Sequence, residues 1–270
     1  MKKVILTTAI TLALSTAGTA YATNDLIVNQ TGSDHQITVN QNSTSALINS
    51  IEINQSMSFN SVSINQDGGT NLVRSTQIGE GGMVSVDQTG NANTTNIDQA
   101  GMSNQVNIIQ NNDSNSAIID QRGGTNMFTL SQDGVGNMIT ANSSDTSMLN
   151  DVTLSQNGDN NQITSNVDGS NAIINVTQSG MDLSLDVTDN GNMSQITLNQ
   201  TGSMNTITGF SDMGSDNNIT VNQFDNGNNV SYTVQGSNNT YNLTQNNTGQ
   251  TMNVSSMGDN NSVTVTQNGM

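Results

Sequence analysis

Glutamine recurs along the chain at a spacing of eleven residues, and the chemistry open to such a column is hydrogen bonding between stacked amides. Because a buried amide without a partner costs about 1–3 kcal/mol, the column is viable only if each amide bonds to the next. Identical amides one strand apart can do so, as in the ladders of cross-β fibrils. The expected inward column comprises Gln30, Gln41, Gln55, Gln66, Gln77, Gln88, Gln99, Gln110, Gln121, Gln132, Gln156, Gln178, Gln200, Gln223, Gln245 and Gln267.

Asparagine and glycine recur in the same frame. Asparagine falls five places after the glutamine and is expected to join the inward amide ladder, as at Asn60, Asn71, Asn93, Asn104, Asn126 and Asn261. Glycine falls two places after the glutamine, where a turn needs positive φ and has no room for a Cβ. These predicted turn glycines include Gly68, Gly90, Gly134, Gly158, Gly202 and Gly258. A phosphate-cradling loop would need a helix N-terminus, which the pattern does not provide.

Few other residues have types and spacing suited to catalysis. Asp98 and Asp120 should lie on one solvent face as neighbours, where they act as gatekeepers against sideways pairing. A pair of glycosidase carboxylates would need a substrate cleft and an aromatic platform, and the glycine-rich calcium nonapeptide is missing. Cysteine is absent and His35 is the only histidine. The sequence therefore predicts a protein that is not an enzyme, with no catalytic residue, metal site or cofactor.

The elements that position these residues are short strands and tight turns. Each unit reads apolar-x-apolar-x-Gln-x-Gly-x-x-Asn-x, as at residues 37–41 and 84–88, and 22 units run from Leu26 to Gln267. Alternation with Val, Ile and Thr, interrupted by Gly and Asn, favours strands over a helical supercoil. After Gln132 the glutamine survives in every second unit only, so the true repeat is 22 residues. The predicted fold is all-β: a β-solenoid with two strands per rung, about 11 rungs and cross-β stacking.

The first 22 residues differ from the rest and are expected to form a signal peptide. Lys2 and Lys3 precede an apolar stretch, and Ala20-Tyr21-Ala22 reads as a cleavage site. The repeat β-solenoid is then expected to occupy residues 23–270 and to be secreted without membrane insertion. Two of the four cations lie in the leader and none of the 21 acids does, so the mature net charge is −19. With Arg74 and Arg122 as the only remaining cations, nucleic acid is excluded as a partner.

The ends of the predicted solenoid lack the usual protection of a sheet edge. Proline is absent throughout, and no lysine remains after cleavage. Uncapped rungs can continue from one molecule to the next, so the chain is expected to polymerise head to tail with itself. The assembly ends are expected at Leu26, Val28, Gln30, Gln41, Val263, Val265 and Gln267.

The repeated pattern resembles that of the bacterial curlins. It is clear at residues 66–71 leading to Gln77 and at residues 88–93 leading to Gln99. The resemblance implies a subunit of extracellular functional amyloid that leaves the cell through a curli-type outer-membrane secretion pore. It also implies a nucleator subunit as partner and fibres attached to the cell surface, which build biofilm matrix and mediate adhesion.

The resemblance also assigns roles to terminal residues. In curlins the inward amides of the terminal repeats govern nucleation and growth, and the matching positions are Gln30, Gln41, Asn261 and Gln267. Because it has no basic residues near its C-terminus, the chain resembles the major curli subunit more than the nucleator. The familiar curlins have about half as many rungs, and their major subunit carries a Gly- and Asn-rich segment before the first repeat that is absent here.

Two alternative functions and one residue that does not fit the inward pattern remain open at the level of sequence. The alternatives are a monomeric secreted β-solenoid that binds ice through rows of threonine such as Thr264 and Thr266, or one that binds carbohydrate. The residue that does not fit is Asp189, which falls in an inward column where burial of an unpaired carboxylate is costly. Asp189 is therefore expected either to take up a proton or to open its rung locally.

Overall fold

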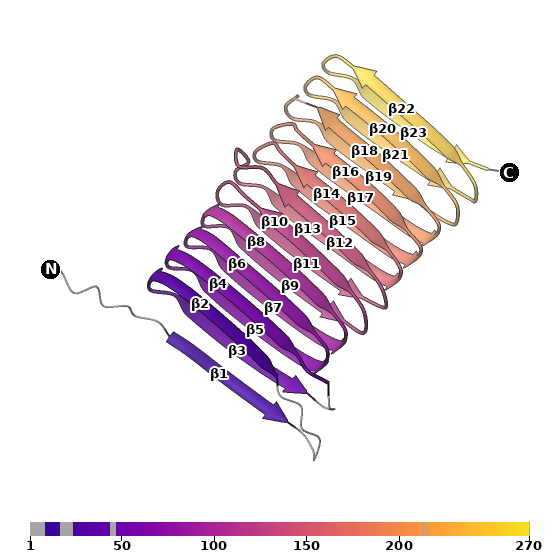
Figure 1. The fold of residues 1–270 in the computed structure, drawn as a ribbon. Helices are drawn as coiled ribbons and strands as arrows, with labels where there is room; N and C mark the ends of the chain where they lie inside the picture. The colour runs from indigo at the N-terminus through magenta and orange to yellow at the C-terminus, as the bar shows by residue number, and fades with distance from the viewer. Residues whose placement is uncertain (1–8, 17–23, 44–46, 213, 270) are drawn as a thin grey trace.

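The computed structural model describes residues 9–16, 24–43, 47–212 and 214–269, and within these ranges the regular elements are β-strands (Figure 1). The chain alternates between two parallel sheets, and one strand in each sheet completes one turn of a solenoid. The two sheets face each other and form a single column, with the N-terminal strands at one end and the C-terminal strands at the other. The predicted all-β solenoid of about 11 turns is confirmed.

We call the two sheets the odd sheet and the even sheet, after the numbers of their strands. The odd sheet has twelve strands: β1 (Ala9–Thr16), β3 (Gln36–Ser43), β5 (Ser61–Gly69), β7 (Met83–Asn91), β9 (Gln105–Asn111), β11 (Met127–Asp133), β13 (Asp151–Asp159), β15 (Ile173–Met181), β17 (Gln195–Ser203), β19 (Asn218–Gln223), β21 (Thr240–Asn246) and β23 (Ser262–Asn268). The even sheet has eleven: β2 (Asp25–Ser33), β4 (Ser50–Ser58), β6 (Leu72–Glu80), β8 (Thr94–Met102), β10 (Ser116–Gln121), β12 (Met138–Ser143), β14 (Gln162–Val167), β16 (Ser184–Asp189), β18 (Thr206–Asp212), β20 (Asn229–Gln235) and β22 (Thr251–Met257).

The strands pair in parallel and in register, so equivalent residues of successive turns lie one above the other. Gln66 pairs with Gln88, which lies 22 residues further along the chain. Longer turns absorb the places where the repeat lengthens, since Gln41 still pairs with Gln66 and Gln132 with Gln156. Each column of the sequence pattern thus becomes a physical column that runs along the solenoid.

The core is one layer of side chains between the two sheets. The two apolar positions of each strand point inward, and from β3 to β21 their side chains are almost entirely buried. Such a thin core explains how a chain with only 31% hydrophobic residues folds without a wide interior. In one inward column a small residue lies next to a large one: Gly209 pairs with Tyr232 and leaves the space that the Tyr232 ring occupies. A Cβ on Gly209 would lie 2.2 Å from the Tyr232 hydroxyl oxygen.

Strand β1 lies within the segment that the sequence assigned to the signal peptide. It pairs in parallel with β3 and places Leu12 opposite Val39 and Leu14 opposite Gln41. The sequence pattern did not predict this strand. The physical reason is that residues 10–14 alternate like residues 37–41, with leucine where the repeat has glutamine. The apolar N-terminal segment and the repeat strands share this alternation, so this segment pairs with the edge of the odd sheet at β3.

Candidate functional site

The glutamines of the odd sheet form one unbroken ladder from Gln41 in β3 to Gln267 in β23. Each Nε2 donates to the Oε1 of the glutamine in the next turn, over 2.7 to 3.1 Å. The second N–H of most of these amides is also used: Gln132, for example, donates to the Ser116 carbonyl of the even sheet in the same turn, over 3.0 Å. The ladder therefore has a direction, because every amide donates towards the C-terminal end.

The corresponding ladder of the even sheet stops halfway. Gln30, Gln55, Gln77, Gln99 and Gln121 are linked over 2.7 to 2.9 Å. Gln121 instead donates onward to the Asn126 carbonyl, over 2.8 Å. The positions that follow in this column are occupied by Ser143, Val167, Asp189, Ser211, Val234 and Ser256. The two sheets therefore differ at the C-terminal end, where only the odd sheet offers an amide.

The asparagine column is buried but does not form the expected amide ladder. The Asn71 Oδ1 accepts the backbone N–H of Asn93 over 3.0 Å, and its Nδ2 donates to the Gly90 carbonyl over 2.9 Å. The cause is position, since this column lies in the turns, where the backbone N–H and carbonyl groups of the next turn are within reach of each asparagine amide. The equivalent bonds to the next turn are made by Asn60, Asn93, Asn104 and Asn126. Asn261 has no turn above it and donates to the Gly258 carbonyl of its own turn.

The turn glycines lie against the carbonyl groups of the next turn. Gly68 has a φ of 119°, and a Cβ on it would lie 1.9 Å from the Gly90 oxygen. Both the backbone conformation and the close stacking therefore require glycine there. Positive φ also occurs at Gly90, Gly134, Gly158, Gly202 and Gly258.

The acidic pair lies on the outer face of the even sheet. Asp98 in β8 and Asp120 in β10 are paired across neighbouring strands. The Nε of Arg122 lies 2.8 Å from the Asp120 Oδ1. Charged groups on an outer sheet face keep that surface solvated and resist sideways pairing. His35, the only histidine, takes the asparagine position in its turn, and its Nε2 lies 3.4 Å from the Thr31 carbonyl oxygen.

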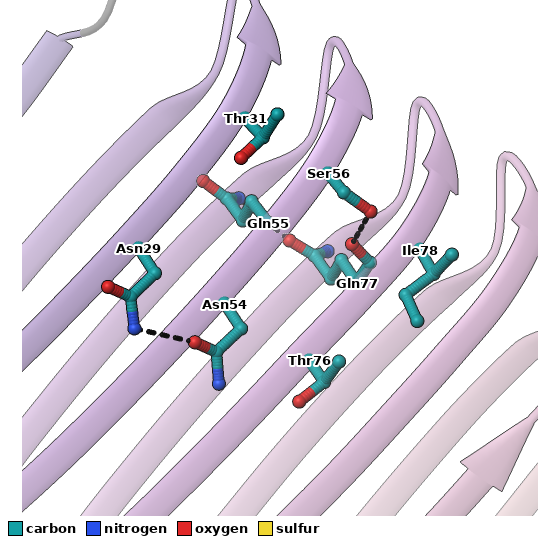
Figure 2. A pocket seen from close by; sticks show the side chains of 8 residues that line it. All are labelled: Asn29, Thr31, Asn54, Gln55, Ser56, Thr76, Gln77 and Ile78. Carbon is teal, nitrogen blue, oxygen red and sulfur yellow. Dashed lines mark hydrogen bonds between the residues drawn. The ribbon is translucent and has the colours of Figure 1, made fainter.

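The even sheet also carries a shallow groove of about 250 Å³ near the N-terminal end. Figure 2 shows its lining: outward side chains such as Asn29 and Asn54, which are hydrogen-bonded to each other over 2.9 Å, and Gln55 and Gln77 of the ladder. None of the lining side chains is charged. Within the described residues, no group of three His, Asp or Glu side chains is placed to hold a metal ion. The groove lining thus contains no acid–base pair.

Among the residues that the structure describes, Asp189 is the one carboxyl group in the core. It lies between Val167 and Ser211 in the even-sheet column and is fully buried, and its Oδ2 has no hydrogen-bond partner. Its Oδ1 accepts the backbone N–H of Gly191 over 3.2 Å. Desolvation raises the pKa of Asp189 to about 6, an increase partly offset by that N–H and by the nearby hydroxyls of Ser194 and Ser211. Neither hydroxyl is hydrogen-bonded to the carboxyl.

The two ends of the odd-sheet ladder are unsatisfied in opposite senses. At the N-terminal end, the buried Oε1 of Gln41 has no hydrogen-bond partner among the described residues. At the C-terminal end, Gln267 is half-buried, and its Nε2 donates only to the Thr251 carbonyl, over 3.1 Å. Leu26, Val28, Val263 and Val265 pack partly buried against the two ends of the core. One end thus presents an acceptor and the other a donor, each beside partly buried apolar side chains.

One family model matches the chain. Residues 101–134, which include β9, β10 and β11, match the curlin associated repeat. The strands that flank this segment are stacked on it in register and continue its glutamine column. No curated protein matches the chain. Among the described residues there is no helix that is long and apolar enough to cross a membrane.

Proposed function

We propose that the chain is a curlin-repeat protein and a structural subunit of extracellular amyloid fibres, because the repeat matched at residues 101–134 continues in register along the solenoid. The observation that carries the proposal is the complementarity of the two ladder ends. The Gln267 amide has a proton to donate, and the Gln41 oxygen lacks a donor. A second copy of the chain supplies the missing partner at each end.

The two sheets meet in phase when copies are joined head to tail. Each turn adds one strand to each sheet, so β2 of one copy continues the sheet that ends at β22 of another, and β3 continues the sheet that ends at β23. In this arrangement Gln41 follows Gln267, and the apolar pair of β3 follows Val263 and Val265. Unpaired strand edges promote such pairing. The joint continues both the core and the odd-sheet ladder.

The direction of the ladder favours head-to-tail joints over the other two pairings. Two N-terminal ends would bring together two amide oxygens, and two C-terminal ends would bring together two donors. Leaving a buried polar group without a partner costs about 1–3 kcal/mol. A head-to-tail contact leaves a free end on each side, so the product is an open filament rather than a closed dimer.

Removal of the leader is part of the proposal. With residues 1–22 present, β1 covers the edge of β3. Cleavage after Ala22 removes β1 and exposes the Gln41 face. We assign residues 1–22 as a signal peptide and residues 23–270 as the secreted, fibre-forming solenoid. From the curlin family we carry over a nucleator subunit and an outer-membrane secretion pore as partners, and biofilm and adhesion as the roles of the fibre.

The test is assembly of the purified mature segment. Residues 23–270, incubated at micromolar concentration, should form fibres whose growth is accelerated by preformed seeds and whose diffraction shows reflections near 4.8 and 10 Å. A β-rich species that stays monomeric would contradict the proposal. In that case the ends would be protected, and a solenoid that binds carbohydrate or ice as a monomer would be the better interpretation.

A further inference from the structure

The outer faces of the two sheets differ in charge. Each strand places two central side chains on the outer face. One precedes and the other follows the second inward apolar residue, as Thr38 and Asn40 flank Val39 in β3. From β3 to β23 of the odd sheet these positions hold Thr, Ser or Asn everywhere except at Asp87 and Ile109. We call this surface the odd-sheet face.

The equivalent positions of the even sheet are more highly charged and more varied. They carry Glu52, Arg74, Asp98, Asp120 and Asp186. They also include the large apolar side chains of Ile27, Ile118 and Phe210. In these central columns the odd sheet carries one acid, Asp87, and the even sheet carries four, while Asp67, Asp133 and Asp151 lie at the margins of the outer face of the odd sheet.

We propose that the odd-sheet face is the surface through which two filaments pack side by side, with a second copy of this chain as the occupant. The proposal rests on the fibre proposed above. Two mature chains, each with a net charge of −19, repel one another at most orientations. At physiological ionic strength charges interact over roughly 8 Å, so contact is least costly where both surfaces lack charge. Two odd-sheet faces come nearest to that condition, since Asp87 is the one charged residue in their central columns.

The polar groups of this face are partly satisfied before any contact forms. The Asn40 Nδ2 donates to Asn65 and the Asn65 Nδ2 to Asp87, both over 2.9 Å, and Asn199 donates to Asn222 over 2.9 Å. These bonds run along the column, so they survive when water is removed from the face. Short Thr, Ser and Asn side chains can interdigitate across two sheets in the dry interfaces typical of cross-β assemblies.

The area is sufficient for a stable contact. Eleven strands at a spacing of roughly 4.8 Å and a strip about 16 Å wide give about 800 Å² per copy, which equals the contribution of one partner to an interface of standard size. The strip also continues across each head-to-tail joint, because Thr264 and Thr266 of β23 precede Thr38 and Asn40 of β3. Lateral contact is therefore multiplied along a filament and strengthens with its length.

The test places the same charge on either face. One variant combines Thr153→Asp and Thr244→Asp on the odd-sheet face. The matched control combines Thr140→Asp and Thr233→Asp on the even sheet, in the same two turns and at the same two outward positions. Elongation is followed by seeded growth, and lateral packing by the mass per unit length of the filaments in electron microscopy.

Wild-type filaments and the control should be paired or bundled. The odd-sheet variant should elongate within about twofold of the wild-type rate and lose at least half of its mass per unit length. Retained bundling in that variant, equal loss in both variants, or single wild-type filaments would overturn the inference while leaving the fibre intact. Single filaments that bind a polysaccharide through this face would also overturn it. Failure of the wild-type chain to form fibres would overturn the proposed function itself.

Discussion

Gln41 and Gln267 are the two ends of a single hydrogen-bonded ladder that runs through the odd sheet. The Gln41 oxygen is buried without a partner, while the Gln267 amide nitrogen donates only to a backbone carbonyl. All the amides between them donate forward and accept from behind, as Gln178 does between Gln156 and Gln200. The internal links are expected to govern stability, and the terminal pair is expected to govern growth.

Breaking the ladder in its middle should destabilise the fold. Gln178→Leu keeps a similar volume but leaves the Gln156 donor and the Gln200 acceptor unpaired in the core. We expect a loss of about 2–4 kcal/mol in the free energy of unfolding, from two orphaned polar groups. The midpoint of guanidinium denaturation measures it. Thr201→Ala, at an exposed position on the neighbouring β17, is the control and should change the midpoint little.

Removing the terminal donor should slow growth. Gln267→Leu takes away the donor that Gln41 of the next copy needs, and we expect seeded elongation to slow about tenfold, equivalent to the cost of one buried orphan group. Ser256→Ala is the matched control, since it alters the same column of the even sheet, where the ladder has already ended. Equal slowing in both variants would mean that the odd-sheet ladder has no special part in the joint.

Stability should fall as the pH rises past the titration of Asp189. Its pKa is raised from 3.8 in the unfolded chain to about 6 in the fold. The folded state then binds the proton more tightly, so stability is greatest below about pH 4, falls between pH 4 and 6, and stays lower above. The difference is roughly 3 kcal/mol, at 1.36 kcal/mol per pKa unit.

The variant Asp189→Gln should remove this dependence and raise the denaturation midpoint at pH 7. Asp186→Asn is the control, because Asp186 points outward from the same strand, β16. It should leave the decline between pH 4 and 6 in place. An Asp189→Gln protein with an unchanged or lower midpoint at pH 7 would show that the buried carboxylate is not a source of instability.

The leader should inhibit growth while it remains attached. The uncleaved chain, residues 1–270, should extend seeds more slowly than residues 23–270, because β1 occupies the edge on which the next copy would pair. Leu12→Asp places a charge at the register position opposite Val39, whose own side chain is buried, which should detach β1. That variant of the uncleaved chain should recover growth. Identical rates for all three chains would show that β1 does not guard the edge.

The sequence alone predicted the solenoid and its period, because the alternation and the turn glycines leave a single arrangement with in-register columns. Two features needed the structure. Spacing alone does not distinguish the bonding of Asn71 from that of Gln66. The Asn71 amide lies in a turn and reaches the backbone of the next turn, whereas the Gln66 amide lies on a strand and reaches the next glutamine. Strand β1 was missed because Leu12 and Leu14 fit an export signal and an edge strand equally well.

The central claim is a polar, head-to-tail joint, and cross-linking tests it most directly because the chain contains no cysteine. Asn29→Cys in β2 and Ser255→Cys in β22 occupy the same outward position at opposite ends of the even sheet. Directly paired residues on adjacent strands have a Cα separation within disulfide range. Fibres grown from a mixture of the two single variants should form disulfides between the two kinds of chain on oxidation. Fibres in which each variant bonds only to its own kind would contradict the head-to-tail joint.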